Sequence, residues 1–222
     1  SDDLSDQHWQ QHQDGFIASL ASQPVLLVVR PQPPDLNPDQ GVPPLFRLLE
    51  PLHAAGLRHV EVAWSDHPGW MAFMSDLRRH CPGFWLGAAS VVSQQALEQI
   101  QALELPYAMA PVWNPELQRY ARQNGQLLVP GVFSPSEVMQ AICAGYRVVK
   151  LFPAVDLGPR YWGRLRAPLG SLPFVIAAGG LALKDVPAWL SCGHGAVALG
   201  RSAIRADGVD PALFDWLERL PS

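Results

Sequence analysis

One lysine lies inside a short apolar run that has the length of a buried strand. The run covers 145–154, with the sequence GYRVVKLFPA, and Lys150 stands near the carboxyl end of the strand expected over 146–151. Burial among valine, leucine and phenylalanine side chains disfavours the charged ammonium and lowers the pKa of a lysine. The neutral amine is the form that attacks a carbonyl carbon to give a Schiff base. The alternative is that Lys150 extends beyond the strand end and keeps its ammonium in water.

A glutamate lies within a second apolar run. Glu61 alternates with Val60 and Val62, so its side chain points to the opposite face of the strand expected over 58–64. A buried carboxylate is costly unless it has a partner or a role. Glu61 therefore forms an ion pair with Lys150 or Arg30, or it moves protons beside an imine-forming lysine with its pKa raised towards neutrality.

The elements that must position these groups alternate between strand and helix. Strands are expected over 24–30, 58–64, 84–89, 107–111, 127–130, 146–151, 174–177 and 195–199. Helices are expected over 4–21, 45–55, 69–80, 94–103, 115–123, from Ser134 onward, 183–190 and 211–220, with only short helical turns in 156–169. The segment 31–44 has six prolines and is expected to be a loop without regular structure.

Eight strands, each followed by a helical or connecting segment, are typical of an α/β (β/α)8 TIM barrel. We expect a single domain over 1–222, with an N-terminal helical extension over 1–22. A doubly wound open sheet is the alternative fold. The apolar character of all eight strands and the lack of a GxGxxG turn disfavour it.

In such a barrel the active site forms at the carboxyl ends of the strands. Glu61 and Lys150 belong to two of the strands, and Ser90 and Pro111 follow two others. Gly179 and Gly180 come after the seventh strand. The run Gly200, Arg201 and Ser202 comes after the eighth.

The glycines after these last two strands are placed to bind phosphate. Backbone N–H groups at such turns, together with the N-terminus of a following helix, suit an anion. Glycine also serves tight turns for conformational reasons alone. Arg201 adds positive charge to this site, or it is a solvated helix residue.

Composition narrows the class of protein. A net charge of -4 and a pI near 5.9, with no basic stripe, give no sign of a nucleic-acid partner. The longest apolar runs are too short to cross a bilayer, and the first residues lack the order of a signal peptide. Three widely spaced cysteines predict reduced thiols in a cytoplasmic protein, with Cys143 on the core-facing side of a helix. No histidine or cysteine spacing predicts a metal site.

Several segments together resemble one enzyme family. The matching segments are Val149 to Ala154 around Lys150, Gly56 to Val62 around Glu61, Gly87 to Val91 around Ser90, Pro111 after the fourth strand, and Pro130-Gly131-Val132 with Ser136-Glu137. From about 17 to 206 the chain resembles the class I aldolases that cleave 2-keto-3-deoxy-6-phosphogluconate (KDPG) and 4-hydroxy-2-oxoglutarate (KHG).

That resemblance implies a retro-aldol lyase. Lys150 would be the Schiff-base residue and Glu61 the proton shuttle. Ser90, Pro111 and Phe152 would contact the substrate, and Gly179, Gly180, Gly200, Arg201 and Ser202 would hold its phosphate. No metal or organic cofactor is implied, and the family's usual assembly is a homotrimer.

The chain also departs from the family pattern. Ser65 stands where the family has an arginine that holds the substrate carboxylate, a change that removes a bidentate clamp. Arg30, at the end of the first strand, is a candidate replacement. Arg201 stands where the family has a glycine, and Ala178 where it has a threonine.

Three rival functions remain open from the sequence. A non-phosphorylated 4-hydroxy-2-oxo acid is the nearest rival substrate. A phosphosugar isomerase or epimerase would leave Lys150 without a covalent role. A divergent barrel that binds a small phosphorylated acid without turning it over is favoured by Ser65.

Overall fold

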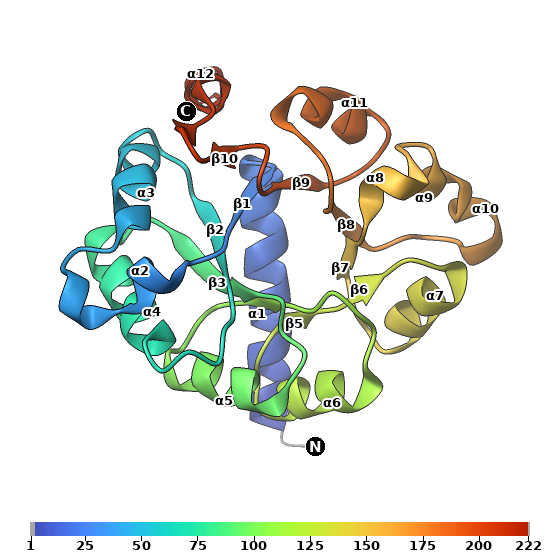
Figure 1. Cartoon of the computed structure of the whole chain (residues 1–222). Helices are drawn as coiled ribbons and strands as arrows, with labels where there is room; N and C mark the ends of the chain where they lie inside the picture. The colour runs from blue at the N-terminus through green and yellow to red at the C-terminus, as the bar shows by residue number, and fades with distance from the viewer. Residues whose placement is uncertain (1–2, 222) are drawn as a thin grey trace.

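The computed structural model describes residues 3–221, and a ring of parallel strands forms its centre (Figure 1). Residues 1, 2 and 222, which belong to the expected segments 1–22 and 1–222, lie outside the described residues. Within the described part, the sheet consists of nine strands. They are β1 (Val25–Val29), β2 (His59–Ala63), β3 (Trp85–Ala89), β4 (Ala108–Met109), β5 (Leu128–Val129), β6 (Gly131–Val132), β7 (Val148–Leu151), β8 (Phe174–Ala177) and β9 (Ala196–Leu199).

Pro130 closes the ring. The strand order is β5-β4-β3-β2-β1-β9-β8-β7-β6, so the two ends of the sheet are β5 and β6, which follow each other in the chain on either side of Pro130. A proline has no N–H for the strand ladder, and the strand expected over 127–130 is therefore divided. The Pro130 carbonyl still accepts a hydrogen bond from the Lys150 N–H at 2.9 Å. The result is a nearly closed (β/α)8 barrel, which confirms the expected fold.

Helices surround the ring and occupy the expected places. The longer ones are α1 (Asp3–Ser22), α3 (Pro44–Ala54), α4 (Trp70–His80), α5 (Gln94–Ala102), α6 (Pro115–Gln123), α7 (Pro135–Cys143), α11 (Val186–Ser191) and α12 (Pro211–Glu218). The short ones are α2 (Pro33–Leu36), η1 (Pro38–Gln40), α8 (Ala154–Leu157), α9 (Tyr161–Arg164), α10 (Arg166–Leu169) and η2 (Leu183–Asp185). Ser134 forms a capping box with Glu137 at the start of α7.

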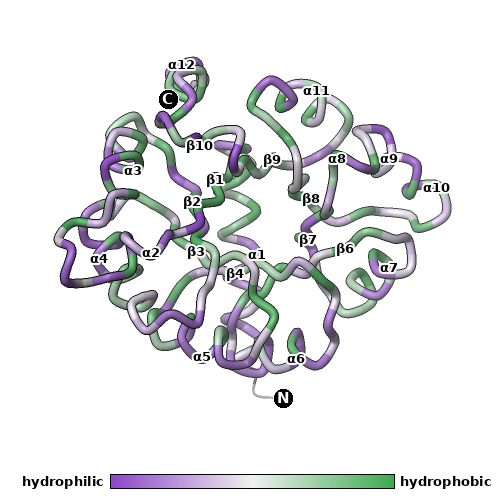
Figure 2. The backbone as a smooth tube through the Cα atoms, in the orientation of Figure 1, coloured by the Kyte–Doolittle hydropathy of each residue, from purple (hydrophilic) through white to green (hydrophobic). Residues whose placement is uncertain are grey.

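Side-chain alternation divides the core into two layers. Val60 and Val62 of β2 and Val149 and Leu151 of β7 belong to the large cluster between the strands and the outer helices. The opposite faces of the strands supply a second cluster inside the ring. Figure 2 shows hydrophobic residues concentrated along the strands.

The helix α1 closes the amino end of the barrel. In Figure 1 it crosses the middle of the ring, and its Phe16 and Leu20 join the interior cluster. The Phe16 ring stacks on the Tyr107 ring, with centroids 4.1 Å apart. The N-terminal extension thus forms the floor of the barrel interior.

The segment 31–44 differs from its expectation. It contains α2 and η1, because proline at a first helical position fits the helix and loses no needed hydrogen bond. The Asp35 carboxylate, which accepts the N–H groups of Gln32 and Leu45 at 2.8 Å each, ties this segment to the start of α3. Our prediction of an irregular loop was wrong here.

Two further differences lie later in the chain. A hairpin of β10 (Ile204–Arg205) and β11 (Gly208–Val209), which was not predicted, lies between β9 and α12. Cys143 is exposed, so the core-facing position expected for it was wrong. Among residues 3–221, no helix has both the length and the apolar character that crossing a membrane requires.

Candidate functional site

Lys150 points into the barrel. It lies in β7 between Gly131 of β6 and Ile176 of β8, and its two strand neighbours face the outer helices. Only 7% of its surface is exposed. Burial lowers the pKa of the Lys150 ammonium, while the negative charge of Glu61 acts in the opposite direction. The alternative in which this lysine reaches out into water is therefore wrong.

Glu61 is fully buried inside the same ring. In register it lies between Val28 of β1 and Gly87 of β3. Neither carboxylate oxygen has a hydrogen-bond partner in the described part of the chain. Burial raises the pKa of Glu61 to about 7, and the positive charge of Lys150 opposes this rise.

The buried ion pair considered for Glu61 does not form. No ion pair joins it to Lys150 or to Arg30 within residues 3–221. The barrel interior instead holds a glutamate whose pKa is raised to about 7 and a lysine whose pKa is lowered. Chemically, such a pair supplies a nucleophilic amine and a group that gives and takes protons at neutral pH.

Arg30 and Ser90 meet at the barrel mouth. The Arg30 guanidinium donates to the Ser90 hydroxyl at 3.4 Å. Ser90 has a φ of +59°, a left-handed conformation that is strained for a residue with a side chain and is found at functional sites. The Ser65 hydroxyl accepts the N–H of His67 at 3.1 Å in the turn that leads to α4. Ser65 thus serves the local turn, whereas Arg30 and Ser90 contact each other.

Phe152 and Pro111 border the lysine. The Lys150 Nζ lies 5.0 Å from the centre of the Phe152 ring. Pro111 packs against β6: a Cβ on Gly131 would lie 2.4 Å from the Pro111 carbonyl carbon. Gly131 therefore lets the end of the fourth strand approach the strand that pairs with β7. Any larger residue at position 131 would collide with the backbone of Pro111.

The turn after β8 lies directly against α8. Gly179 and Gly180 have φ angles of +102° and +80°, and a Cβ on Gly180 would lie 2.4 Å from Val155. The Val155 N–H donates to the Gly179 carbonyl at 3.1 Å. Glycine is required at this turn for conformation and for close approach.

The turn after β9 touches the turn after β8. The Ser202 hydroxyl donates to the Leu181 carbonyl at 2.8 Å, which brings the two glycine-containing turns together. Arg201 is exposed in a turn, so its alternative as a solvated helix residue was wrong. No helix begins directly at either turn in residues 3–221: η2 starts only at Leu183, and the β10–β11 hairpin follows Gly200. A helical N-terminus thus follows the turn after β8 at a distance of two residues, whereas the turn after β9 leads into the hairpin.

Tyr107 is a site residue that the sequence analysis missed. It is buried, and its hydroxyl donates to the carbonyl of Val60, the residue before Glu61, at 2.9 Å. Burial raises the pKa of Tyr107, and the charge of Glu61 adds to this effect. A Cβ on Gly87 would lie 2.4 Å from the Tyr107 ring. One sequence signal could have found it: Tyr107 stands two residues before Met109, so both side chains point to the same, interior face of the strand.

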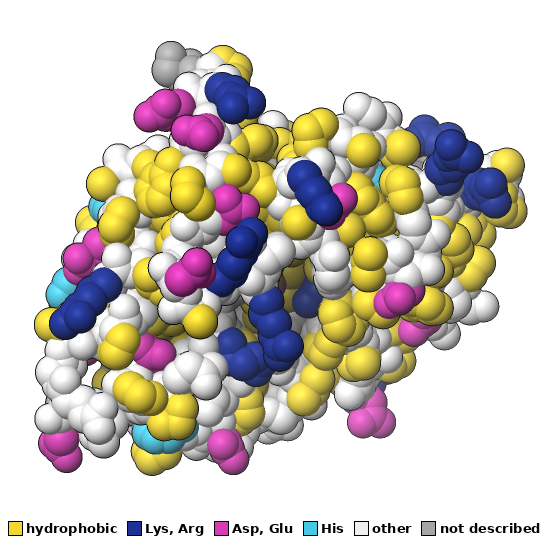
Figure 3. All heavy atoms as spheres, turned by 45° about the horizontal axis from the view of Figure 1, so that its top comes forward, with side chains coloured by type: hydrophobic (Ala, Val, Ile, Leu, Met, Phe, Trp, Pro, Cys, Tyr) yellow, Lys and Arg dark blue, Asp and Glu magenta, His cyan; other side chains and the backbone are white. Residues whose placement is uncertain are grey.

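Side chains at the barrel mouth enclose a cleft of about 630 Å³ between the start of α3 and the β10–β11 hairpin. Arg30 and Arg201 both line it. Figure 3 shows a hollow at the centre of this face with Lys and Arg side chains around it. The cationic groups predicted from sequence therefore gather at one opening.

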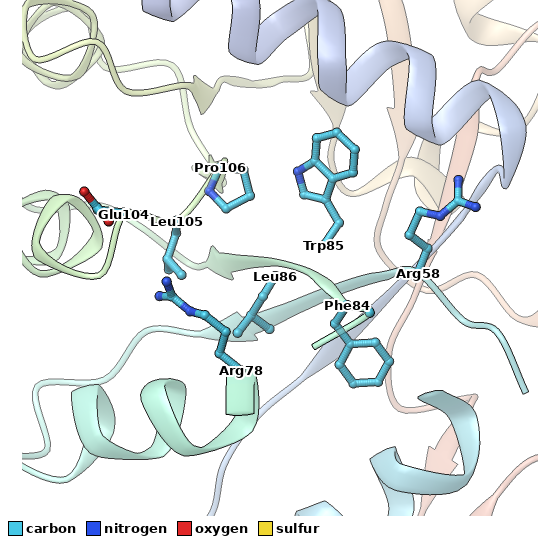
Figure 4. Close-up of a pocket in the computed structure, with 9 residues that line it drawn as sticks. Arg58, Arg78, Phe84, Trp85, Leu86, Glu104, Leu105 and Pro106 are labelled. Carbon is cyan, nitrogen blue, oxygen red and sulfur yellow. The ribbon is translucent and has the colours of Figure 1, made fainter. Parts of the chain in front are cut away.

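A second cavity of about 280 Å³ lies at the opposite end of the barrel, at the starts of β2, β3 and β4 (Figure 4). Arg58 and Arg78 lie on either side of it, and Trp85 and Pro106 also line it. Arg58 donates to the Ser22 hydroxyl and Arg78 to the Leu103 carbonyl, so both guanidinium groups have structural partners. Within residues 3–221, no group of three or more His, Cys, Asp or Glu residues is arranged to hold a metal ion.

Comparisons with known proteins identify what this arrangement is similar to. A family model described as KDPG and KHG aldolase matches residues 41–219. The 2-dehydro-3-deoxy-phosphogluconate aldolase of Pseudomonas aeruginosa is 30% identical over 177 residues, covering 79% of this chain and 80% of the relative. A probable 2-dehydro-3-deoxy-6-phosphogalactonate aldolase of Rhizobium meliloti is 25% identical over 179 residues, covering 81% of each chain.

One solved structure has the same barrel fold as this chain. The KDPG aldolase of Legionella pneumophila, captured with pyruvate as a covalent carbinolamine intermediate, superposes with a TM-score of 0.74. It is 22% identical, and the match covers 93% of this chain and 98% of that chain. At this identity the likeness shows the barrel fold.

Proposed function

The chain belongs to the KDPG and KHG aldolase family, and from that premise we propose that it cleaves a 4-hydroxy-2-oxo acid through a Schiff base on Lys150. Membership in the family makes it a carbon–carbon lyase. The observation that carries the proposal is the buried pair of Lys150 and Glu61, whose pKa values burial moves in opposite directions, each towards neutrality.

In the proposed reaction the neutral Lys150 amine attacks the C2 carbonyl carbon of the substrate. Glu61 gives a proton to the carbonyl oxygen, and the carbinolamine loses water to leave an iminium. A base then takes the proton of the C4 hydroxyl, and Glu61, now ionised, is the nearest candidate. The C3–C4 bond breaks, its electron pair moves to the iminium as an enamine, and an aldehyde leaves. Protonation at C3 and hydrolysis release pyruvate and free Lys150.

The other site residues would hold the substrate. Ser90 and Arg30, which contact each other, are placed to bind its carboxylate. Phe152 would pack against the imine and Pro111 would shape the pocket. The two joined turns would receive a terminal phosphate through Gly179, Gly180, Gly200, Arg201 and Ser202.

Two substrates fit this chemistry. One is KDPG, cleaved to pyruvate and glyceraldehyde 3-phosphate. The other is 4-hydroxy-2-oxoglutarate, cleaved to pyruvate and glyoxylate. Steady-state assays of both compounds decide between them.

Borohydride trapping with pyruvate tests the mechanism. The expected result is a reduced adduct, located on Lys150 by peptide mass mapping and missing from Lys150→Ala. A wild-type protein that forms no adduct at millimolar pyruvate would contradict the Schiff-base proposal.

One observation favours a second candidate, a barrel that binds a phosphorylated acid without turnover. Ser65 replaces a carboxylate-binding arginine with a hydroxyl already used in a turn. Tight binding of a phosphorylated acid without pyruvate release would support this candidate. An isomerase or epimerase has no comparable support, because it leaves the buried Lys150 unused.

We also propose that the chain acts as a single-domain homotrimer in the cytoplasm. Support for self-association comes from large apolar side chains exposed on consecutive loops, namely Val92 after β3, Val112 after β4 and Phe133 after β6. Exposed apolar side chains on one rim favour a protein contact. Sedimentation equilibrium is expected to give three times the chain mass of 24.3 kDa, and a monomer would contradict the assembly.

A further inference from the structure

The Tyr107 ring occupies the barrel interior on the strand next to the one that pairs with Glu61. Gly87, the register partner of Glu61 in β3, has no side chain, and a Cβ there would lie 2.4 Å from the Tyr107 ring. Tyr107 is only 1% exposed, and its ring stacks on the Phe16 ring of α1. The ring therefore takes the interior space that a side chain at position 87 would fill beside Glu61.

The Tyr107 hydroxyl is committed to the backbone of the two strands that carry Glu61 and Gly87. It donates to the Val60 carbonyl of β2 at 2.9 Å, and the Trp85 carbonyl of β3 lies 3.4 Å away. Neither carboxyl oxygen of Glu61 receives a hydrogen bond from Tyr107 or from any other group among residues 3–221. Tyr107 thus fills space near the carboxyl group without stabilising its ionised form by a hydrogen bond.

The charges around Glu61 do not explain its protonation. The titratable and charged groups on the surrounding strands are His59 on β2, Tyr107 on β4, Lys150 on β7 and Arg30 after β1, and the interior cluster from α1, β8 and β9 is apolar. Burial lowers the pKa of His59 to about 4, so its ring is neutral at neutral pH. Lys150 lowers the pKa of Glu61, and burial raises it to about 7. The side chains that bury Glu61 therefore decide its protonation.

We propose that Tyr107 is a positioning residue for proton transfer by Glu61: its ring keeps water from the carboxyl group, and its hydroxyl fixes the strand that carries it. The proposal deepens the proposed function and rests on it, because it concerns the proton shuttle of the same site. A carboxyl group kept dry holds its proton up to neutral pH, where it can both give and take one. Tyr107 acts through Glu61 and β2.

Tyr107→Leu tests the role of the ring. The variant removes the hydroxyl and shortens the side chain, which leaves a space near the Val60 carbonyl, the Trp85 carbonyl and the Glu61 carboxyl group. These three polar groups are enough to hold a buried water. Water at the carboxyl group favours the ionised form, so the pKa of Glu61 should fall by about one unit or more. NMR titration of the full chain with isotope-labelled glutamate carboxyl groups measures this change, and Glu61→Gln identifies the Glu61 signal.

Tyr107→Phe tests the role of the hydroxyl. It keeps the ring and leaves too little room for a water, so Glu61 should titrate as in the wild type. The kcat of pyruvate release should fall about tenfold with KM unchanged, because β2 loses its tether and the carboxyl group is less well placed.

Tyr146→Leu is the matched control. It removes another buried tyrosine, one that belongs to the cluster outside the ring and bonds to Gln118 of α6. The titration of Glu61 and the kcat should both stay as in the wild type.

Two results would overturn the role of the ring: a Glu61 titration that Tyr107→Leu leaves in place, or one that Tyr146→Leu shifts equally. Unchanged kcat in Tyr107→Phe would overturn the role of the hydroxyl, and this variant keeps the test decisive if Tyr107→Leu does not fold. The NMR titration requires no turnover. Failure of pyruvate trapping on wild-type Lys150 would refute the proposed reaction, whereas the titration would still decide whether Tyr107 controls Glu61.

Discussion

Burial favours the neutral amine of Lys150 and the neutral carboxylic acid of Glu61. Removing both groups from water favours the neutral amine and the neutral acid, and their mutual attraction only partly restores the charges. Both carboxyl oxygens of Glu61 are buried and have no hydrogen-bond partner within residues 3–221. An unpaired buried carboxyl reduces stability, and such groups concentrate at functional sites.

The pH profile of catalysis should depend on Glu61. For the wild type we expect an inflection in kcat/KM near the raised pKa of about 7. Glu61→Gln should remove this inflection and lower kcat/KM by roughly 10²–10⁴-fold, because proton transfer is lost. The measurement is the rate of pyruvate release from pH 5 to 9. The exposed Glu98→Gln on α5 serves as control, and an unchanged inflection in Glu61→Gln would contradict the assignment.

A restored arginine at position 65 should improve carboxylate binding. Ser65→Arg is expected to raise kcat/KM for KDPG by about tenfold to a hundredfold, because a bidentate guanidinium–carboxylate contact is gained. Ser65→Lys adds the charge without the planar fork and should gain less. Steady-state kinetics measures both. Equal or lower rates in Ser65→Arg would contradict this prediction and show that an arginine at 65 adds nothing to the carboxylate contact proposed for Arg30 and Ser90.

At the scale of elements, the site depends on how closely neighbouring strands and turns approach. Gly87 leaves room for the Tyr107 ring, and Gly131 leaves room for Pro111. The Tyr107 hydroxyl also donates a hydrogen bond to the carbonyl of Val60, the residue before Glu61. The Tyr107 ring stacks on the Phe16 ring of α1. The terminal helix thus supports the strand that presents the carboxylate.

Gly87→Ala should destabilise the barrel by about 1–3 kcal/mol, because its Cβ would overlap the Tyr107 ring in a packed interior. Chemical denaturation measures the free energy of unfolding. Gly163→Ala is the matched control, since a Cβ there meets nothing within 4 Å. In the double variant with Tyr107→Leu, the cost of Gly87→Ala should fall. Additive costs would show that this contact does not explain the glycine.

For the whole molecule, the buried pair links stability to pH. Between about 4.5, the ordinary pKa of a glutamate, and about 7, the unfolded chain has released the Glu61 proton while the folded chain retains it. The free energy of unfolding therefore falls as pH rises through this window. The rise in the Glu61 pKa from 4.5 to about 7 corresponds to a loss of stability on the order of 3 kcal/mol above pH 7.

Glu61→Gln should remove that penalty. Relative to wild type, its free energy of unfolding should rise between pH 4.5 and 7 by on the order of 3 kcal/mol and stay level above. Urea denaturation at several pH values measures the difference. A difference that does not change with pH would contradict the raised pKa of Glu61.

The barrel and much of the site could be predicted because they depend on local patterns. Period-two alternation indicated that Glu61 faces the interior, and the fold rule placed Glu61 and Lys150 in strands whose carboxyl ends share one face of the barrel. Short-range signals also gave the Ser134 capping box. The roles of the predicted binding residues remain predictions. Tyr107 was missed because its importance lies in contacts with β2 and β3, which no local pattern encodes.

The sequence by itself determined the strand and helix order, the inward direction of Glu61, and the family, because side-chain period and motif spacing are properties of adjacent residues. Only the tertiary structure decided that Glu61 stays unpaired and that Arg30 contacts Ser90. It alone also brought Arg201 to the same cleft as Arg30. These outcomes depend on the distances between strands far apart in the chain, and closure of the ring at Pro130 fixes those distances.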